Sequence, residues 1–111
     1  MSRKNKSPKV AVLFGTRPEL IKLAPVIAAA KKLGIATVTI SSSQHTDLLK
    51  PFIDAFSIRI DHDLRVMRAG QSPNDVASRA IARLGRVLTK VRPDLLLVQG
   101  DTTTALAGAI A

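Results

Sequence analysis

Short apolar runs alternate with longer amphipathic segments along most of this chain. The first run, Lys9 to Phe14, has the length and the valine content of a buried strand. The segment after it repeats apolar residues at the spacing of three and four that is typical of a helix, and the alternation then continues to the last residue. The expected strands are residues 9–14, 35–40, 57–63 (short and weak) and 94–99, and the expected helices are residues 18–32, 46–56, 73–92 and 102–111.

This order of elements predicts the fold class. An alternation of strands and helices in which the strands are almost wholly apolar is typical of a parallel sheet covered by helices on both faces. We therefore predict an α/β fold with a doubly wound parallel sheet. Residues 1–8 are expected to be a disordered basic leader, and residues 9–111 a single Rossmann-like domain whose last helix is cut short.

Two helices carry specific signals at their ends. In the first, Pro18 suits the opening position, Gly34 suits the end, and Pro25 is expected to bend the helix. In the third, Ser72 is the expected cap, followed by Pro73 at the first position and Asp75 at the third, and the helix is expected to end before Pro93. The predicted buried stripes are Leu20, Ile21, Ala24, Ile27 and Ala28 in the first helix, and Ala77, Ala80, Ile81, Leu84, Leu88 and Val91 in the third.

Composition narrows the class of protein further. The chain has 111 residues, 46% of them hydrophobic, which is enough for a core of its own. It has no cysteine, so neither a disulfide nor a thiolate metal site is possible, and this fits a reducing compartment. No apolar run approaches the roughly 20 residues that span a bilayer, and no signal-peptide pattern follows the basic start. We expect a soluble, cytoplasmic protein without membrane contact.

The charge is strongly basic, with 17 basic and 8 acidic residues. Such a balance fits nucleic acid, an anionic surface or phosphorylated ligands. Arg79, Arg83, Arg86 and Lys90 recur at helical spacing, and we interpret them as a solvated helix face. Aromatic residues are only 3% of the chain, fewer than a stacking surface for single-stranded nucleic acid needs. Nucleic acid is therefore not the expected partner.

The polar residues that invite a functional explanation gather just after the strands. They are Gly15 to Arg17 after the first strand, Ser41, Gln44 and His45 after the second, and Gln99 to Thr104 after the fourth. In open parallel sheets, ligands bind outside the carboxyl ends of the strands. The sequence therefore predicts one ligand site at that edge.

The residues after the first strand point to an anionic ligand. Gly15 permits a close approach of backbone, the following helix offers free N–H groups and a partial positive charge, and Arg17 adds a fork of donors suited to phosphate. Lys22 adds a further charge one turn on. The chain has neither a dinucleotide fingerprint nor a Walker loop. The alternative is that Gly15 only makes a turn and Arg17 only a surface ion pair.

The acidic residues and the histidines are each open to two interpretations. Asp101 is either a helix cap or a general base that can also bind a sugar hydroxyl. His45 is more often structural than catalytic in such a loop. The cluster from Asp61 to Asp63 resembles a metal site but alternates faces on a short strand, so we assign it to the surface. Glu19 is expected to interact with the helix dipole.

Several sequence blocks together resemble one enzyme family. The blocks are Phe14-Gly15-Thr16-Arg17-Pro18-Glu19 with Ile21-Lys22-Leu23-Ala24-Pro25, then Gln44-His45, Asp94 to Val98, and Gly100-Asp101-Thr102-Thr103-Thr104. In order and spacing they resemble the non-hydrolysing UDP-N-acetylglucosamine 2-epimerases. The resemblance covers nearly the whole chain after Lys9.

The resemblance implies a fold and a reaction. The domain would be the amino-terminal Rossmann-like half of a glycosyltransferase-B-like fold, with the active site between two domains. The enzyme would interconvert UDP-N-acetylglucosamine and UDP-N-acetylmannosamine by eliminating and re-adding UDP, with neither metal nor nicotinamide, and its product would feed surface polysaccharides. A relative that hydrolyses the intermediate to release N-acetylmannosamine and UDP, or a non-catalytic module that binds anions or nucleotides, remains an alternative.

The resemblance also assigns residues. Asp101 matches the acidic position to which the family assigns a catalytic or substrate role, and it is the candidate catalytic residue. Arg17 and Lys22 match substrate-binding positions, and Gln44 and His45 match a loop that touches a regulatory substrate molecule in some members. Gly15, in the turn before Arg17, is a further candidate for substrate binding. Here Thr46 and Asp47 follow His45, which departs from the family pattern and puts such regulation in doubt. Family members are much longer and typically dimeric, so this chain is expected to be an inactive fragment that lacks the carboxyl-terminal domain.

Overall fold

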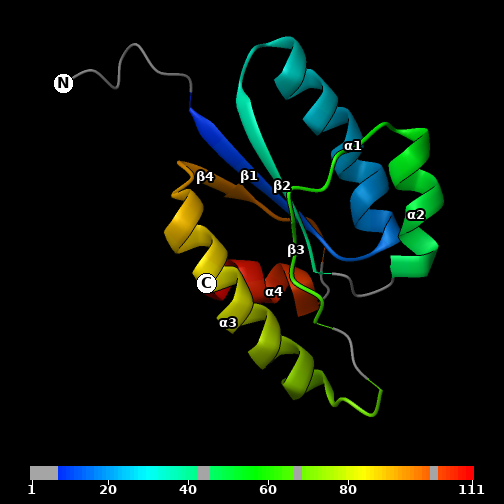
Figure 1. The fold of residues 1–111 in the computed structure, drawn as a ribbon, viewed down its shortest axis with the longest axis vertical. Coiled ribbons are helices and arrows are strands. Elements are labelled where there is room, and N and C mark those ends of the chain that lie inside the picture. Colours follow the sequence, from blue (N-terminus) through cyan, green and yellow to red (C-terminus); the bar gives the residue numbers. More distant parts are fainter. Residues whose placement is uncertain (1–7, 43–45, 67–68, 101–102) are drawn as a thin grey trace.

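The computed structural model describes residues 8–42, 46–66, 69–100 and 103–111, and Figure 1 shows how the elements are arranged. The predicted leader, apart from Pro8, lies outside these residues. Among the described residues no helix has the length and apolar character that crossing a membrane requires. The elements in chain order are β1 (Lys9–Phe14), α1 (Arg17–Lys32), β2 (Ala36–Ser41), α2 (Thr46–Ala55), β3 (His62–Asp63), α3 (Pro73–Val91), β4 (Leu95–Leu97) and α4 (Thr103–Ile110).

The four strands form one parallel sheet in the order β3-β2-β1-β4. β1 is central, and it pairs with β2 from Lys9↔Ala36 to Phe14↔Ser41. On its other side β1 pairs with β4 from Val10↔Leu95 to Val12↔Leu97. This is the beginning of the strand order of a doubly wound nucleotide-binding sheet. The predicted α/β fold class is confirmed.

Successive side chains of β1 pack into two separate hydrophobic cores, one on each face of the sheet. Val12 and Phe14 pack with Leu20, Leu23 and Ile27 of α1 on one face of the sheet. Ala11 and Leu13 pack on the other face with α3 and α4, where Leu84 and Ala107 are fully buried. This follows from the two-residue period of a strand. Figure 1 accordingly shows α1 and α2 on one side of the sheet and α3 and α4 on the other.

The buried stripe of α1 is rotated from the predicted one. Leu20, Ala24 and Ile27 are buried as predicted, but Ile21 is 42% exposed and Ala28 is also exposed. Leu23 and Glu19 are buried instead. The prediction placed the stripe by helical spacing alone, whereas packing against the sheet decides which face of the helix is buried. The helix is continuous through Pro25.

The ends of α3 follow the predicted chemistry. Ser72 Oγ accepts a hydrogen bond from Asp75 N at 3.1 Å, and Asp75 Oδ2 accepts one from Ser72 N at 3.1 Å. This reciprocal capping box satisfies donors that a helix start leaves free. The helix ends at Val91, and Arg92 takes a left-handed conformation with φ 53° ahead of Pro93. Val76, which the predicted stripe omitted, is buried beside Ala80 and Leu84.

The third and fourth strands are shorter than predicted. β3 contains only His62–Asp63, because side-chain groups replace the sheet hydrogen bonds just before it. Asp61 Oδ2 accepts from Thr39 N at 2.9 Å, and Thr39 Oγ1 donates to the Arg59 carbonyl. β4 begins after Asp94, whose carboxylate accepts from Lys9 N at 2.8 Å. The second strand is shifted by one residue relative to its prediction.

Candidate functional site

The parallel register brings the predicted polar segments to one edge of the sheet. Phe14 pairs with Ser41 at the ends of β1 and β2, and the last pair of β1 with β4 is Val12 with Leu97. Beyond the strands the segments stay connected, since Ser42 N donates to the Phe14 carbonyl at 2.9 Å. The edge predicted from the positions of Gly15, Ser41 and Gln99 therefore exists as a continuous structural feature.

The carboxylate of Glu19 accepts hydrogen bonds from backbone amides just before α1. Its side chain is 2% exposed, and Oε1 accepts from Gly15 N at 2.7 Å and from Thr16 N at 3.1 Å. The expectation that Glu19 interacts with the positive end of the helix is confirmed. The Gly15 and Thr16 amides, which precede the helix, therefore already donate to an internal carboxylate. The predicted anion site at the start of the helix stays a prediction.

The loop after β4 closes on the same carboxylate. Gly100 has φ +88°, a conformation that favours glycine, and a Cβ added there would lie 3.8 Å from Glu19 Oε2. The Glu19 carboxylate therefore lies between the turn that follows β1 and Gly100, which begins the loop between β4 and α4. The sequence offered a signal for this role, because Glu19 stands at the third position of a capping box after Thr16.

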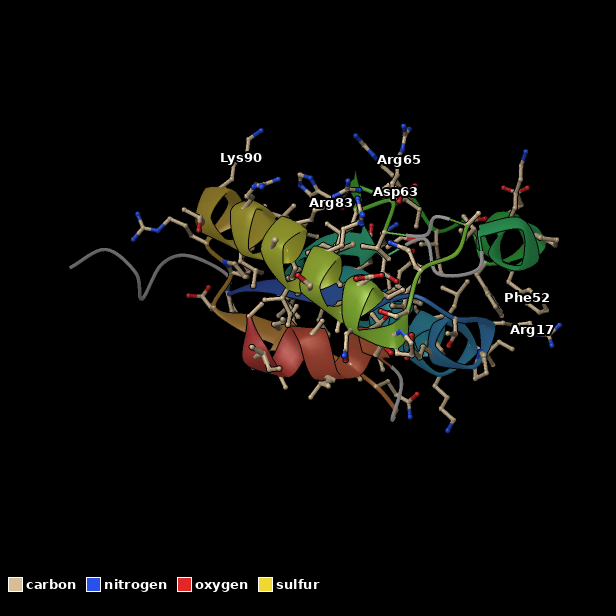
Figure 2. The ribbon with its side chains drawn as sticks, turned by 90° about the horizontal axis from the view of Figure 1, so that it is seen from below. Arg17, Phe52, Asp63, Arg65, Arg83 and Lys90 are labelled. Atoms are coloured by element: carbon tan, nitrogen blue, oxygen red, sulfur yellow. The ribbon has the colours of Figure 1, made fainter. Side chains whose placement is uncertain are left out.

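Arg17 is the charged group that remains exposed at this edge. Its guanidinium carbon lies 5.7 Å from the centre of the Phe52 ring of α2, within the range of a cation–π contact. Figure 2 shows the two side chains side by side at the α1–α2 end of the molecule. Phe52 in turn lies beside Phe56, with ring centres 6.5 Å apart. The contact restricts Arg17 while leaving its donors open to solvent.

Lys22 is also exposed, but it does not share a helix face with Arg17. Five residues along an α-helix correspond to a rotation of about 140° beyond one full turn. The two side chains therefore point in different directions from α1.

A buried pair of hydroxyl groups connects two of the loops and was not predicted. Ser42 and Thr104 are 0% and 2% exposed, and Ser42 Oγ lies 2.9 Å from Thr104 Oγ1. Val66 N donates to the Ser42 carbonyl at 3.1 Å. The hydrogen bond fixes the start of α4 against the end of β2. No periodicity or motif identifies such a pair, since it depends on how two distant loops meet.

Three of the predicted site residues lie outside the described part of the chain. They are Gln44, His45 and the predicted catalytic residue Asp101. Their assignments stay predictions. For the described residues there is no group of three or more His, Cys, Asp or Glu side chains that suits a metal ion. Asp61 and Asp63 are exposed, and Asp61 instead binds Thr39.

The basic stripe of α3 differs from the solvated face that was predicted. Arg83 Nη1 donates to the carbonyls of Leu64 and Arg65, each at 2.6 Å, and so holds the segment after β3. Arg79 is half-buried, whereas Arg86 and Lys90 are exposed. Figure 2 shows Arg83 turned toward Arg65 and Lys90 projecting outward. Arg83 is therefore engaged within the fold, which leaves less charge for a nucleic-acid surface.

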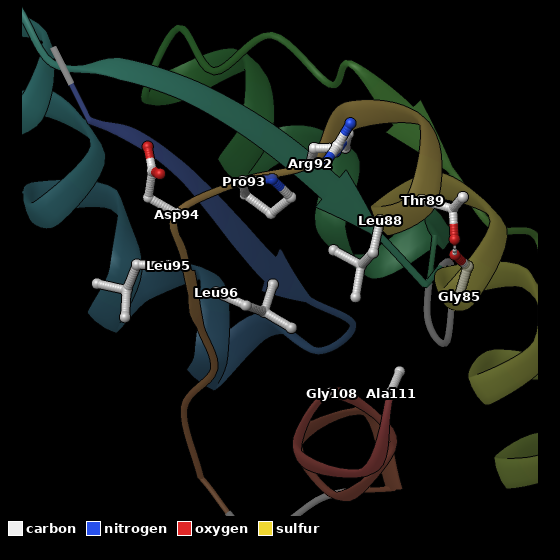
Figure 3. Close-up of a pocket in the computed structure, with 10 residues that line it drawn as sticks. All are labelled: Gly85, Leu88, Thr89, Arg92, Pro93, Asp94, Leu95, Leu96, Gly108 and Ala111. Atoms are coloured by element: carbon white, nitrogen blue, oxygen red, sulfur yellow. Dashed lines mark hydrogen bonds between the residues drawn. The ribbon is translucent and has the colours of Figure 1, made fainter. Parts of the chain in front are cut away.

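A large hollow in the described residues lies away from this edge. It has a volume of about 860 Å³ and is lined by the end of α3, the start of β4 and the end of α4, including Leu88, Leu96 and Gly108 (Figure 3). These residues border the amino end of β4.

Comparison with known proteins identifies similar sequences and structures. The family described as UDP-N-acetylglucosamine 2-epimerase matches residues 28–111. The UDP-N-acetylglucosamine 2-epimerase of Bacillus subtilis is 41% identical over 107 residues, which is 96% of this chain and 28% of that protein. The Escherichia coli enzyme of the same name is 40% identical over 104 residues, 93% of this chain and 28% of that protein. The chain thus spans just over a quarter of the length of the curated relatives it matches.

Solved structures agree with these sequences. The 2-epimerase of Neisseria meningitidis, bound to UDP-GlcNAc, matches with a TM-score of 0.85 and 40% identity, covering 92% of this chain and 28% of that one. The Methanocaldococcus jannaschii enzyme, in complex with UDP-GlcNAc and UDP, matches with a TM-score of 0.86 and 33% identity over the same shares. Both are therefore similar to this chain in fold and in sequence.

Proposed function

Because the chain belongs to the UDP-N-acetylglucosamine 2-epimerase family, we propose that it is the amino-terminal part of an enzyme that interconverts UDP-N-acetylglucosamine and UDP-N-acetylmannosamine. The observation that carries this proposal is the likeness, over most of the chain, to a 2-epimerase solved with UDP-GlcNAc bound. The parallel sheet with its loops gathered at one edge supports it independently.

The proposed reaction is redox-neutral. A base removes the proton from the second sugar carbon while the bond from the first carbon to UDP breaks, and UDP leaves with the electron pair to give a glycal. Return of a proton to the opposite face and of UDP to the first carbon gives the epimer. We assign Asp101 a catalytic role here, as a base or as the partner of a sugar hydroxyl. The scheme needs neither a metal nor a nicotinamide.

Arg17 and Lys22 are the proposed contacts for the diphosphate and sugar, and Gln44 and His45 are further substrate contacts. The exposed guanidinium of Arg17, restricted by Phe52, is suited to a phosphate because its planar fork loses little freedom on binding. Gly15 contributes a tight turn around Glu19, since its amide is already engaged.

The proposal treats this chain as half of a site. Arg17 stands on an open surface, whereas elimination of UDP requires a site that excludes water and holds both leaving group and sugar. We therefore expect residues 1–111 alone to be inactive. For the complete protein we propose a homodimer in the cytoplasm, with a carboxyl-terminal domain that closes the site.

A chimeric enzyme tests this function. Residues 1–111 would replace the matching part of the Bacillus subtilis 2-epimerase, and conversion of UDP-N-acetylglucosamine would be followed by NMR. We expect activity in the chimera, and for Asp101→Asn a fall in kcat on the order of a hundredfold with little change in KM, as for loss of a general acid–base group.

Two outcomes would contradict the proposal in different ways. A folded chimera without turnover would argue against the epimerase assignment, and a product of free N-acetylmannosamine with UDP would favour a hydrolysing relative. Unchanged kcat for Asp101→Asn would remove Asp101 from the mechanism while leaving the assignment intact.

A further inference from the structure

The aromatic ring of Phe52 in α2 is held in place by its neighbours. Phe52 is partly buried and packs against the core on the α1 face of the sheet, which includes Leu20 and Leu23. Its ring also lies beside that of Phe56, with the ring centres 6.5 Å apart and the planes inclined by 31°. Aromatic pairs at this separation attract each other beyond the effect of burial alone. The position of the Phe52 ring is therefore restricted by two separate contacts.

The main chain around Arg17 is also held in place. Arg17 is the first residue of α1. The two residues before it, Gly15 and Thr16, donate their amides to the buried carboxylate of Glu19. After it, Leu20 N donates to the Thr16 carbonyl at 3.1 Å. The backbone from which the Arg17 side chain extends is therefore restricted by hydrogen bonds from both directions along the chain.

The guanidinium of Arg17 lies over the ring of Phe52. Its central carbon is 5.7 Å from the centre of the ring, and Figure 2 shows the two side chains side by side. Arginine stacks on aromatic rings through the flat face of its guanidinium, which leaves the N–H donors in that plane available to a ligand. A long side chain that is restricted before binding loses less rotamer freedom when it binds. The contact therefore favours the binding of an anion by Arg17.

A contribution to folding stability alone does not account for this contact. Cation–π contacts at exposed positions are weak, and Arg17 is exposed. The carboxylate closest to it in the sequence, that of Glu19, is 2% exposed and accepts from the amides of Gly15 and Thr16. What the contact with Phe52 determines is the position of a cation at the edge of the sheet where the strands end.

We propose that Phe52 is a positioning residue for ligand binding, because its ring holds the Arg17 guanidinium in the geometry that binds the diphosphate of a sugar nucleotide. The inference rests on the proposed function, which supplies the diphosphate ligand. It assigns to α2 a part in binding that no sequence motif indicates, since Phe52 belongs to none of the blocks that resemble the family. The role requires a flat aromatic ring and not only an apolar side chain.

The test is a set of binding measurements by NMR titration with two probes, UDP-N-acetylglucosamine and inorganic pyrophosphate. Phe52→Leu is expected to weaken the binding of both probes about two- to fivefold, the size of a cation–π contact at an exposed site. Phe52→Tyr keeps the ring and should bind like the wild type. In an Arg17→Ala background, Phe52→Leu should cause no further loss, because Phe52 acts through Arg17.

The side chain of Arg17 supplies a readout that needs no ligand. A guanidinium over a ring experiences its ring current, so the Arg17 Nε–H resonance should be shifted in the wild type and in Phe52→Tyr, and should lose this shift in Phe52→Leu. Ile53→Val is the matched control, because Ile53 is on the same helix and packs against the same core. It should leave both the Arg17 resonance and the affinities unchanged, and thermal unfolding checks that every variant is folded.

The outcomes separate this inference from the proposed function. Pyrophosphate binding that depends on Phe52, without binding of UDP-N-acetylglucosamine, would challenge the proposed function and support the positioning role. An affinity for UDP-N-acetylglucosamine that Phe52→Leu leaves unchanged would overturn the positioning role and leave the proposed function in place. An equal loss in the Arg17→Ala background would also overturn it, since the ring would then contact the ligand directly. Binding of neither probe would count against both.

Discussion

Glu19 places a negative charge at the start of α1, where a bound phosphate is often found in α/β proteins. An external anion would therefore have to displace a buried carboxylate to reach the Gly15 and Thr16 amides. The open donors are those of Arg17, which is exposed and rests against Phe52. We therefore expect different roles for the two residues: Glu19 stabilises the turn, and Arg17 binds the ligand.

Replacing Glu19 by Gln tests this division. Hydrogen bonds to a charged group contribute about 1.5–3 kcal/mol each, so we expect a loss of roughly 2 kcal/mol in the free energy of unfolding. Urea unfolding measures the change, with exposed Asp54→Asn as the control. A loss for Glu19→Gln no larger than for Asp54→Asn would mean that the carboxylate does not hold the turn.

At the scale of elements, the helices pack on the sheet at distances set by particular small residues. A Cβ at Gly108 of α4 would meet Val98 Cγ1 at 2.5 Å and Leu13 Cδ2 at 3.0 Å, so this glycine permits the close approach of α4 to the sheet. Gly85 of α3 has no atom within 4 Å of the same added Cβ. A side chain is therefore excluded at Gly108 by close packing, whereas there is room for one at Gly85.

Alanine at these two positions is expected to change stability in opposite directions. Gly85→Ala removes the conformational cost of a mid-helix glycine and should stabilise the protein by about 0.5–1 kcal/mol. Gly108→Ala overpacks the contact with Val98 and should destabilise it by about 1–3 kcal/mol. Thermal unfolding of the pair measures both effects, and equal shifts of the same sign would contradict the packing of α4 on the sheet.

Sequence patterns predicted which segments are helices and strands better than they predicted which side chains are buried. Apolar runs identified β1, β2 and β4, and Ser72 with Asp75 identified the start of α3, because these signals are local. The third predicted strand overlaps β3 only at His62–Asp63. The exposure of Ile21 was missed, because the width of a buried stripe depends on the surface it meets. The Ser42–Thr104 bond and the engagement of Arg83 were missed for the same reason, since each joins segments that are distant in sequence.

For the whole molecule, the described residues form an α/β unit with exposed side chains at two borders of its sheet. The carboxyl edge of the sheet carries Arg17 and Lys22, and the β4 side carries uncovered leucines. The meeting of the polar segments at one border was predictable from strand order, because segments that follow parallel strands lie at the same edge. The apolar border was not, since Leu95–Leu97 has the sequence of an ordinary buried strand.

The most direct test of the central claim is an amide NMR titration of the 111-residue chain with UDP-N-acetylglucosamine, with N-acetylglucosamine as the uncharged control. We predict weak, saturable shifts confined to the carboxyl edge near Gly15, Arg17, Ser42 and Gly100. Arg17→Ala should lower the affinity about tenfold or more, the cost of a lost charge-assisted hydrogen bond. Shifts centred on the Leu88–Leu96 hollow, or an affinity that Arg17→Ala leaves unchanged, would contradict a UDP-sugar half-site at this edge.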